Sequence, residues 1–93
     1  MEKTRLFVDM DGTLAEWRKA AHFEQLLEKD YFRSLQPYGH VVDAIRTIIH
    51  THSDRFEVHT LSAYLTESIY ALEEKDAWLD EFLPEVTPEK RIF

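Results

Sequence analysis

Two short apolar segments, each followed by a polar cluster, constrain the fold of this chain more than any other feature. Residues 4–8 and 56–61 are rich in β-branched and aromatic side chains, which predicts two buried strands. Residues 91–93 resemble the start of a third strand. Strands that alternate with helices are joined by right-handed crossovers into a parallel sheet. The sequence therefore predicts an α/β fold.

Between the predicted strands, apolar side chains follow the spacing of amphipathic helices. This pattern covers residues 16–29 and 41–50, with a turn predicted at 36–39. A third helical pattern starts at Leu65 and either continues to residue 83 or gives way to a fourth helix, which Pro84 ends. A chain of 93 residues has room for a single core, so residues 1–93 are expected to form one domain.

Composition excludes several classes of function. Eleven Lys and Arg residues stand against 18 Asp and Glu, a formal net charge of -7, which disfavours binding to duplex nucleic acid. The absence of cysteine excludes disulfides, thiolate metal sites and cysteine nucleophiles. No apolar run is long enough to span a membrane, and the N-terminus has no hydrophobic signal core. We therefore expect a cytoplasmic protein that associates with no membrane.

Asp9 and Asp11 follow the first predicted strand, on either side of Met10. Residues i and i+2 of an extended chain point the same way, so the two carboxylates are expected to converge. A hard cation such as Mg²⁺ would relieve their repulsion. One carboxylate can attack phosphorus while the other serves as acid and base. The residues alone are equally consistent with a helix cap or a solvated turn, because Asp-Gly is common in turns.

Residues 9–14, DMDGTL, preceded by the apolar residues 6–8, resemble the first motif of the haloacid-dehalogenase-like phosphatases. The longer string DMDGTLAEW resembles the 5'(3')-deoxyribonucleotidase branch in particular. The resemblance implies a Rossmann-like parallel sheet, a partial core of that family, with residues 14–40 as a short helical cap after the first strand. It also implies that Asp9 is the nucleophile, that Asp11 is the general acid and base, and that Asp9 and the Asp11 carbonyl bind Mg²⁺.

Residues 56–62, FEVHTLS, resemble the family's second motif, a strand that ends in Ser or Thr. The resemblance implies that this hydroxyl holds a phosphate oxygen. Ser62 is preferred and Thr60 kept in reserve, because Lys75 follows Ser62 by 13 positions in a Lys-x-x-Trp segment, as in the deoxyribonucleotidase branch. Lys75 would then neutralise the phosphoryl group. Without the resemblance, Ser62 is typical of a helix N-cap and Lys75 of a solvated helix charge.

Trp17 lies on the segment where this branch places an aromatic side chain against the nucleobase, so the resemblance makes it a substrate-binding candidate. Its spacing alone is that of an ordinary packing residue. The five histidines are scattered, and His50 and His52 do not share a helix face, so no zinc site is predicted.

In the family, the chain continues with a lysine loop and a strand whose acidic pair completes the Mg²⁺ site. The sequence therefore leads to three hypotheses. The first is a Mg²⁺-dependent phosphatase whose substrate is a small phosphate monoester, namely a nucleoside monophosphate. Its hydrolysis would pass through an aspartyl-phosphate intermediate. The others are a truncated, catalytically silent binding module and a phosphoacceptor signalling domain. The first strand is central in the family's sheet, so here it would have an open edge, which predicts a homo-oligomer or a domain-swapped dimer.

Overall fold

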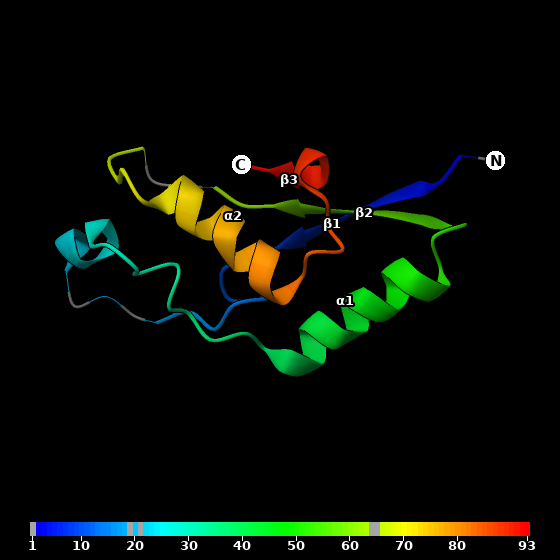
Figure 1. Cartoon of the computed structure of the whole chain (residues 1–93), viewed down its shortest axis with the longest axis horizontal. Helices are drawn as coiled ribbons and strands as arrows, with labels where there is room; N and C mark the ends of the chain where they lie inside the picture. The colour runs from blue at the N-terminus through cyan, green and yellow to red at the C-terminus, as the bar shows by residue number, and fades with distance from the viewer. Residues whose placement is uncertain (1, 19, 21, 64–65) are drawn as a thin grey trace.

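The structure is a computed structural model, which describes residues 2–18, 20, 22–63 and 66–93. Its elements follow the order β1 (Thr4–Asp9), the 3₁₀ helix η1 (Phe23–Leu27), α1 (Gly39–Thr51), β2 (Phe56–Leu61), α2 (Ala71–Phe82), the 3₁₀ helix η2 (Pro88–Lys90) and β3 (Arg91–Ile92) (Figure 1). No helix in this described part combines the length and the apolar character that crossing a bilayer requires.

The sheet has three parallel strands in the order β1-β2-β3. Thr4 of β1 lies opposite Phe56 of β2, and this register continues along both strands. The short β3 pairs with the end of β2, where Arg91 lies opposite Thr60. The predicted α/β fold with a parallel sheet is confirmed, as is the start of a third strand at Arg91.

Both α-helices pack on one face of the sheet. The strand order advances in one direction, so right-handed crossovers place α1 and α2 on the same side. Side chains that alternate toward this side are buried or half-buried: Leu6, Val8, Val58, Thr60 and Arg91. Of these, Leu6, Val8 and Val58 pack in the core with Val42 and Ile45 of α1 and Trp78 and Leu79 of α2. Figure 1 shows α2 crossing in front of the strands.

Within the described part of the chain, no helix covers the opposite face of the sheet. Phe7, Leu61 and Ile92 alternate toward this face and are 49%, 48% and 39% exposed. The Phe7 ring stacks on His59, with 5.3 Å between ring centroids. β1 pairs only with β2 in the described sheet, so its outer edge is open. Pairing with a second copy at this edge stays a prediction.

The predicted helix over residues 16–29 is wrong. Only Phe23–Leu27 are helical in this segment, as the 3₁₀ helix η1, while residues 19 and 21 lie outside the described part. The Glu16 amide donates to the Gln36 carbonyl at 2.7 Å, and the Tyr38 amide donates to the Leu14 carbonyl at 2.8 Å. These bonds hold residues 14–16 extended beside residues 36–38. The region 14–40 is therefore built mainly from extended chain and turns.

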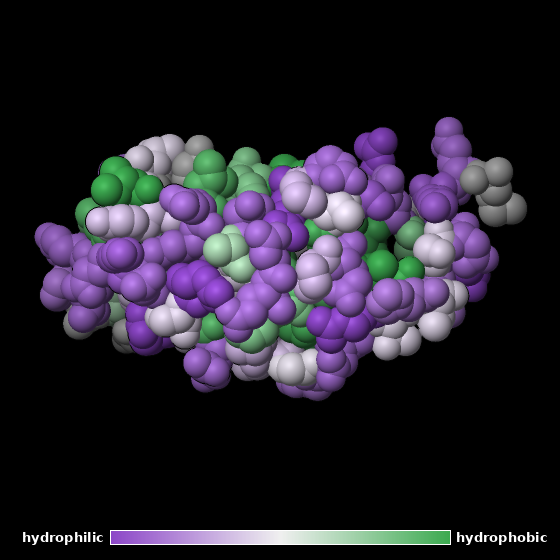
Figure 2. Space-filling view, in the orientation of Figure 1, coloured by the Kyte–Doolittle hydropathy of each residue, from purple (hydrophilic) through white to green (hydrophobic). Residues whose placement is uncertain are grey.

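The third predicted helix is a single element, α2, which begins at Ala71. Ser68 marks its start, because its hydroxyl accepts the Tyr70 and Ala71 amides at 3.2 and 3.1 Å. Ile69 is 82% exposed in the turn before the helix, and Leu65 lies outside the described residues. Figure 2 shows green, hydrophobic residues over the turn before α2, on a face that is otherwise largely hydrophilic. Helix α1 includes the whole predicted range 41–50.

Candidate functional site

Lys75 is a buried ammonium with three hydrogen-bond acceptors. Its Nζ donates to Asp11 Oδ2 at 2.9 Å, to Ser62 Oγ at 2.8 Å and to the Ala63 carbonyl at 2.6 Å. An ammonium has three protons, so all of them are used. The side chain is only 2% exposed, and burial of a charge at such a position requires this pairing. The structure thus brings together three of the residues that the sequence singled out.

The position of Lys75 follows from the pattern of α2. Residues three and four apart on a helix share a face, and the buried stripe of this helix consists of Ala71, Glu74, Lys75, Trp78 and Leu79. Lys75 therefore points into the protein, toward residues that follow β1 and β2. The Phe32 ring, from the region 14–40, lies 4.8 Å from Nζ and covers it on another side.

A tight turn directly after β1 presents Asp11. The Met10 carbonyl accepts the amides of Thr13, Leu14 and Ala15 at 3.2, 2.9 and 2.9 Å, which folds the chain back on itself. Gly12 has φ +82°, in the left-handed region that glycine adopts without strain. The Asp11 side chain remains 27% exposed while it contacts Lys75, so it is open to solvent as well as to the cluster.

Asp9 has a different environment from Asp11. It is the last residue of β1 and is exposed, and its Oδ1 accepts the Met10 amide at 2.9 Å. The two carboxylates were predicted to converge, but their hydrogen bonds lead to different partners. Asp11 accepts from Lys75, and Asp9 accepts from the neighbouring Met10 amide. Their joint action stays a prediction.

Ser62 and Thr60 are clearly separated by the structure. Ser62 is 3% exposed, directly follows β2 and contacts Lys75. Thr60 is fully buried on the covered face, and its hydroxyl has no hydrogen-bond partner in the described part of the chain. Of the two candidate hydroxyls, only that of Ser62 reaches the Lys75 ammonium. The simpler interpretation of Ser62 as a helix N-cap is wrong, because α2 begins nine residues later and Ser68 bonds its first amides.

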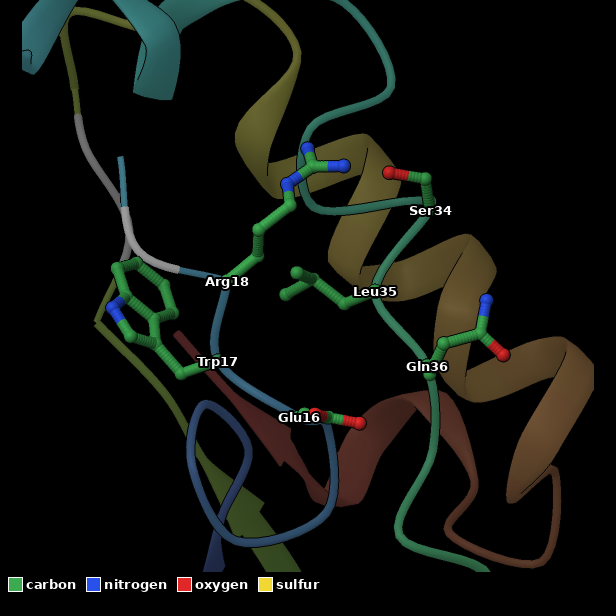
Figure 3. Close-up of a pocket in the computed structure, with 6 residues that line it drawn as sticks. All are labelled: Glu16, Trp17, Arg18, Ser34, Leu35 and Gln36. Carbon is green, nitrogen blue, oxygen red and sulfur yellow. The ribbon is translucent and has the colours of Figure 1, made fainter. Parts of the chain in front are cut away.

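Trp17 is 44% exposed and lies beside the aromatic rings of Tyr31 and Phe32, at centroid distances of 6.0 and 6.4 Å. It borders a cavity of about 330 Å³ that is also lined by Glu16, Arg18, Ser34, Leu35 and Gln36. Figure 3 shows the two chain segments facing one another, with the Leu35 side chain between them and the Trp17 ring turned to the other side. Asp11, Ser62 and Lys75 do not line this cavity. Trp17, the predicted base-stacking residue, therefore lies in a region next to the cluster of Asp11, Ser62 and Lys75 and is not part of it.

Asp9 and the Asp11 backbone carbonyl, the groups that would hold Mg²⁺, offer the ion few protein ligands. The described residues contain no group of three or more His, Cys, Asp or Glu side chains arranged to hold a metal ion. Mg²⁺, however, commonly takes one or two carboxylates and fills its shell with water and substrate phosphate. The exposed Asp9 carboxylate has only one oxygen bonded, to the Met10 amide, so its other oxygen can serve as such a ligand. Asp11 would contribute its backbone carbonyl, since Lys75 engages its carboxylate.

Two neighbours of Lys75 were not predicted from the sequence, Glu74 and Phe32. Glu74 is buried, and its carboxylate accepts three backbone amides of residues 30–33. A signal was available: Glu74 falls with Lys75 on the otherwise apolar stripe of α2, where a charged residue needs a buried partner.

Comparisons with models of known protein families and with curated proteins find no match for this chain. The resemblance of residues 9–14 and 56–62 to phosphatase motifs therefore depends on those residues themselves.

Proposed function

We propose that the chain is a Mg²⁺-dependent phosphatase of the 5'(3')-deoxyribonucleotidase type, which hydrolyses nucleoside monophosphates. The observation that carries the proposal is the cluster of Asp11, Ser62 and Lys75. These residues come from the turn after β1, the end of β2 and helix α2, and they meet beyond the carboxyl ends of parallel strands. Ligands of open α/β sheets bind at this edge.

In the proposed reaction, an Asp9 carboxylate oxygen attacks phosphorus and the bond to the leaving oxygen breaks. Asp11, protonated in the substrate complex once a phosphate oxygen has taken its place beside Lys75, donates its proton to that oxygen, which leaves as the free alcohol of the nucleoside. Asp11 then takes a proton from water as the water oxygen attacks the aspartyl phosphate. This second displacement releases inorganic phosphate and restores the Asp9 carboxylate.

Ser62 and Lys75 would hold the phosphoryl oxygens during both displacements. Phosphoryl transfer depends on positioning and on compensation of negative charge, and a buried ammonium supplies both. Bound Mg²⁺ would add charge neutralisation between Asp9 and the phosphate. Lys75 already donates to one carboxylate and two neutral oxygens, so a phosphate oxygen would replace one of these acceptors.

The test is turnover of nitrophenyl phosphate with Mg²⁺ by the purified chain. Asp9→Asn keeps the shape of the side chain and removes the nucleophile, so we expect activity to fall by about a thousandfold or more. Asp54→Asn makes the same chemical change at an exposed turn residue and is the matched control. Equal activity of wild type and Asp9→Asn would contradict the assignment of the nucleophile.

A second variant separates the two roles of Asp11. A good leaving group needs little protonation, so Asp11→Asn should slow hydrolysis of the phosphoenzyme more than its formation. Rapid-quench trapping would then show the phosphoenzyme accumulating. Equal loss of both steps would make Asp11 a metal-binding or folding residue.

A second candidate function is a catalytically silent binding module. The absence of a group of three acidic or histidine side chains in the described part favours it, because such a group would hold a metal ion more firmly than Asp9 and a backbone carbonyl. Calorimetry with Mg²⁺ and inorganic phosphate addresses both candidates. The silent module predicts binding without turnover. Identical Mg²⁺ binding by wild type and Asp9→Ala would contradict the metal site itself.

A further inference from the structure

The carboxylate of Glu74 is the buried acidic group that the proposed reaction does not use. The residue is 8% exposed. Its Oε2 accepts the Asp30 amide at 2.5 Å, and its Oε1 accepts the Phe32 and Arg33 amides at 3.2 and 3.4 Å. A carboxylate is expensive to bury unless hydrogen bonds replace its water, and three converging amides do so. The carboxylate therefore joins α2 to a turn more than 40 residues earlier in the sequence.

The turn around Asp30 adopts a conformation that suits this contact. Asp30 has φ 67°, in the left-handed region, which is unfavourable for residues other than glycine. Successive amides in a turn of this kind can point into one concavity and bind an anion. The Ser34 amide donates back to the Asp30 carbonyl at 2.9 Å, which closes the turn. Glu74 supplies the anion that satisfies this arrangement from within the same chain.

The side chains of this turn contact the candidate site. Phe32 is 4% exposed, and its ring lies 4.8 Å from Lys75 Nζ. Tyr31 packs against Trp17, and its hydroxyl donates to the Arg18 carbonyl. A shift of the turn would therefore move the cover over the ammonium and the support of Trp17 together.

We propose that Glu74 is a positioning residue, which fixes the turn of residues 30–33 so that Phe32 confines the Lys75 ammonium and Tyr31 supports Trp17. The proposal depends on the proposed function for its consequence, the binding of a phosphate monoester. Its structural part, the hold on the turn, stands independently. The Glu74 carboxylate bonds to backbone amides of residues 30–33, so it acts on the site through this turn.

The experiment compares Glu74→Gln with Glu73→Gln. Both substitutions remove one negative charge from the first turn of α2, but Glu73 is exposed. The first readout is amide hydrogen exchange of residues 30–33, with α1 as an internal reference. We expect exchange at residues 30–33 to rise at least about tenfold in Glu74→Gln, because charged hydrogen bonds protect more than neutral ones. Glu73→Gln should leave it unchanged.

The second readout is the affinity for inorganic phosphate, measured by calorimetry, together with KM and kcat for nitrophenyl phosphate. Glu74→Gln should raise KM and the phosphate dissociation constant by about tenfold while kcat changes less, because the chemistry of Asp9 and Asp11 is untouched. Restoration of the affinity by Glu74→Asp, even in part, would support a role of the carboxylate.

The outcomes separate this proposal from the proposed function. Unchanged exchange at residues 30–33 would contradict the hold on the turn, whatever the activity. Raised exchange with unchanged phosphate affinity would contradict the positioning role. Absence of turnover by wild type would contradict the proposed function and leave the exchange and phosphate-binding results decisive.

Phe32→Leu is a second variant, which removes the ring and keeps the amide. It should weaken phosphate binding without raising exchange in the turn, and normal affinity would overturn the proposed path through Phe32.

Discussion

Two cations are buried in the structure, Lys75 on α2 and Arg91 on β3, and they have different surroundings. The side chain of Lys75 is 2% exposed and that of Arg91 is 1% exposed. Arg91 donates to the carboxylates of Asp76 and Asp80, both at 2.8 Å, and these residues lie one turn apart on the same helix. It also donates to the Val86 carbonyl at 2.8 Å. Arg91 thus fastens β3 to α2 with partners that are close along the chain.

The balance of charge around the two cations differs as well. Arg91 has two carboxylates, which leave no demand for a further anion. Burial alone would lower the pKa of Arg91, but the hydrogen bonds that it donates to Asp76 and Asp80 raise it above the ordinary value. Lys75 has one carboxylate and two neutral oxygens, at the edge of the sheet where ligands bind. The comparison indicates that a buried cation is a candidate for function when a single carboxylate balances its charge and when it lies at the edge of the sheet where ligands of such folds bind.

The largest expected effect is that of Lys75→Met on catalysis. The substitution preserves most of the buried volume and removes the charge, so kcat/KM for nitrophenyl phosphate should fall by about 100- to 1000-fold. Lys3→Met removes an exposed lysine and is the control. Activity within a factor of about three of wild type would place Lys75 with Arg91 as a purely structural cation.

For Arg91→Met we expect the opposite pattern, a large loss of stability with little loss of activity. Loss of the guanidinium leaves the Val86 carbonyl and two carboxylates without their donor, so the free energy of unfolding should fall by about 3 kcal/mol. Chemical denaturation measures the change. Below the unfolding transition, kcat/KM should remain within about threefold of wild type. A large loss of activity in folded protein would break the distinction between the two cations.

A smaller effect concerns Arg46, a further structural cation, which donates to Glu85 Oε2 at 2.8 Å and to the Phe82 carbonyl at 2.6 Å. Burial alone would raise the pKa of Glu85, but its own backbone amide and the Arg46 guanidinium hold it below the ordinary value of 4.5. A lowered carboxyl pKa stabilises the fold above the unfolded value, and this stability is lost as the pH falls through the folded pKa.

Arg46→Met should remove that contribution, about 1 kcal/mol at neutral pH, and should flatten the fall in stability below about pH 4.5. Urea unfolding at a series of pH values measures it. Arg55→Met, at an exposed turn residue, should leave the acid slope as in wild type. An unchanged slope in Arg46→Met would assign acid sensitivity to other carboxylates.

The smallest effect is expected on the uncovered face, opposite both cations. We expect a second copy to pair at the open edge of β1, because an edge strand with an exposed apolar side chain readily recruits another chain. A lysine on an edge strand discourages such pairing, so Phe7→Lys should weaken self-association by about fivefold. Phe23→Lys is the matched control, at 50% exposure against 49% for Phe7. Sedimentation equilibrium distinguishes them, and a monomeric wild type at high concentration would contradict the interface.

Most of the sheet and part of the candidate site could be predicted from the sequence. Alternation of strands and helices predicted the parallel order, because a crossover has one favoured hand. The resemblance to phosphatase motifs singled out Asp11, Ser62 and Lys75 as site candidates, and the structure places them in hydrogen-bond contact. The helix over 16–29 was wrongly predicted, since aromatic residues such as Trp17 and Phe23 are spaced as in a helix but are about half exposed.

Contacts that depend on backbone amides could not be predicted in the same way. Glu74 at the start of α2 is typical of a residue that complements the helix dipole, and nothing in residues 30–33 identifies their amides as its partners. Arg91 is likewise a surface charge by composition, and only the fold brings it to Asp76 and Asp80. Such partners are set by tertiary placement, which periodicity does not encode.

The two tryptophans give the molecule separate optical reporters. Trp78 is 1% exposed and donates its indole N–H to the Leu35 carbonyl at 2.8 Å, whereas Trp17 is 44% exposed. Emission from Trp78 is therefore shielded from acrylamide, and the quenchable emission comes from Trp17. A ligand that bound near Trp17 would change the quenchable fraction, while loss of the core would expose both rings. A single fluorescence titration thus distinguishes movement around residues 16–18 from unfolding of the domain.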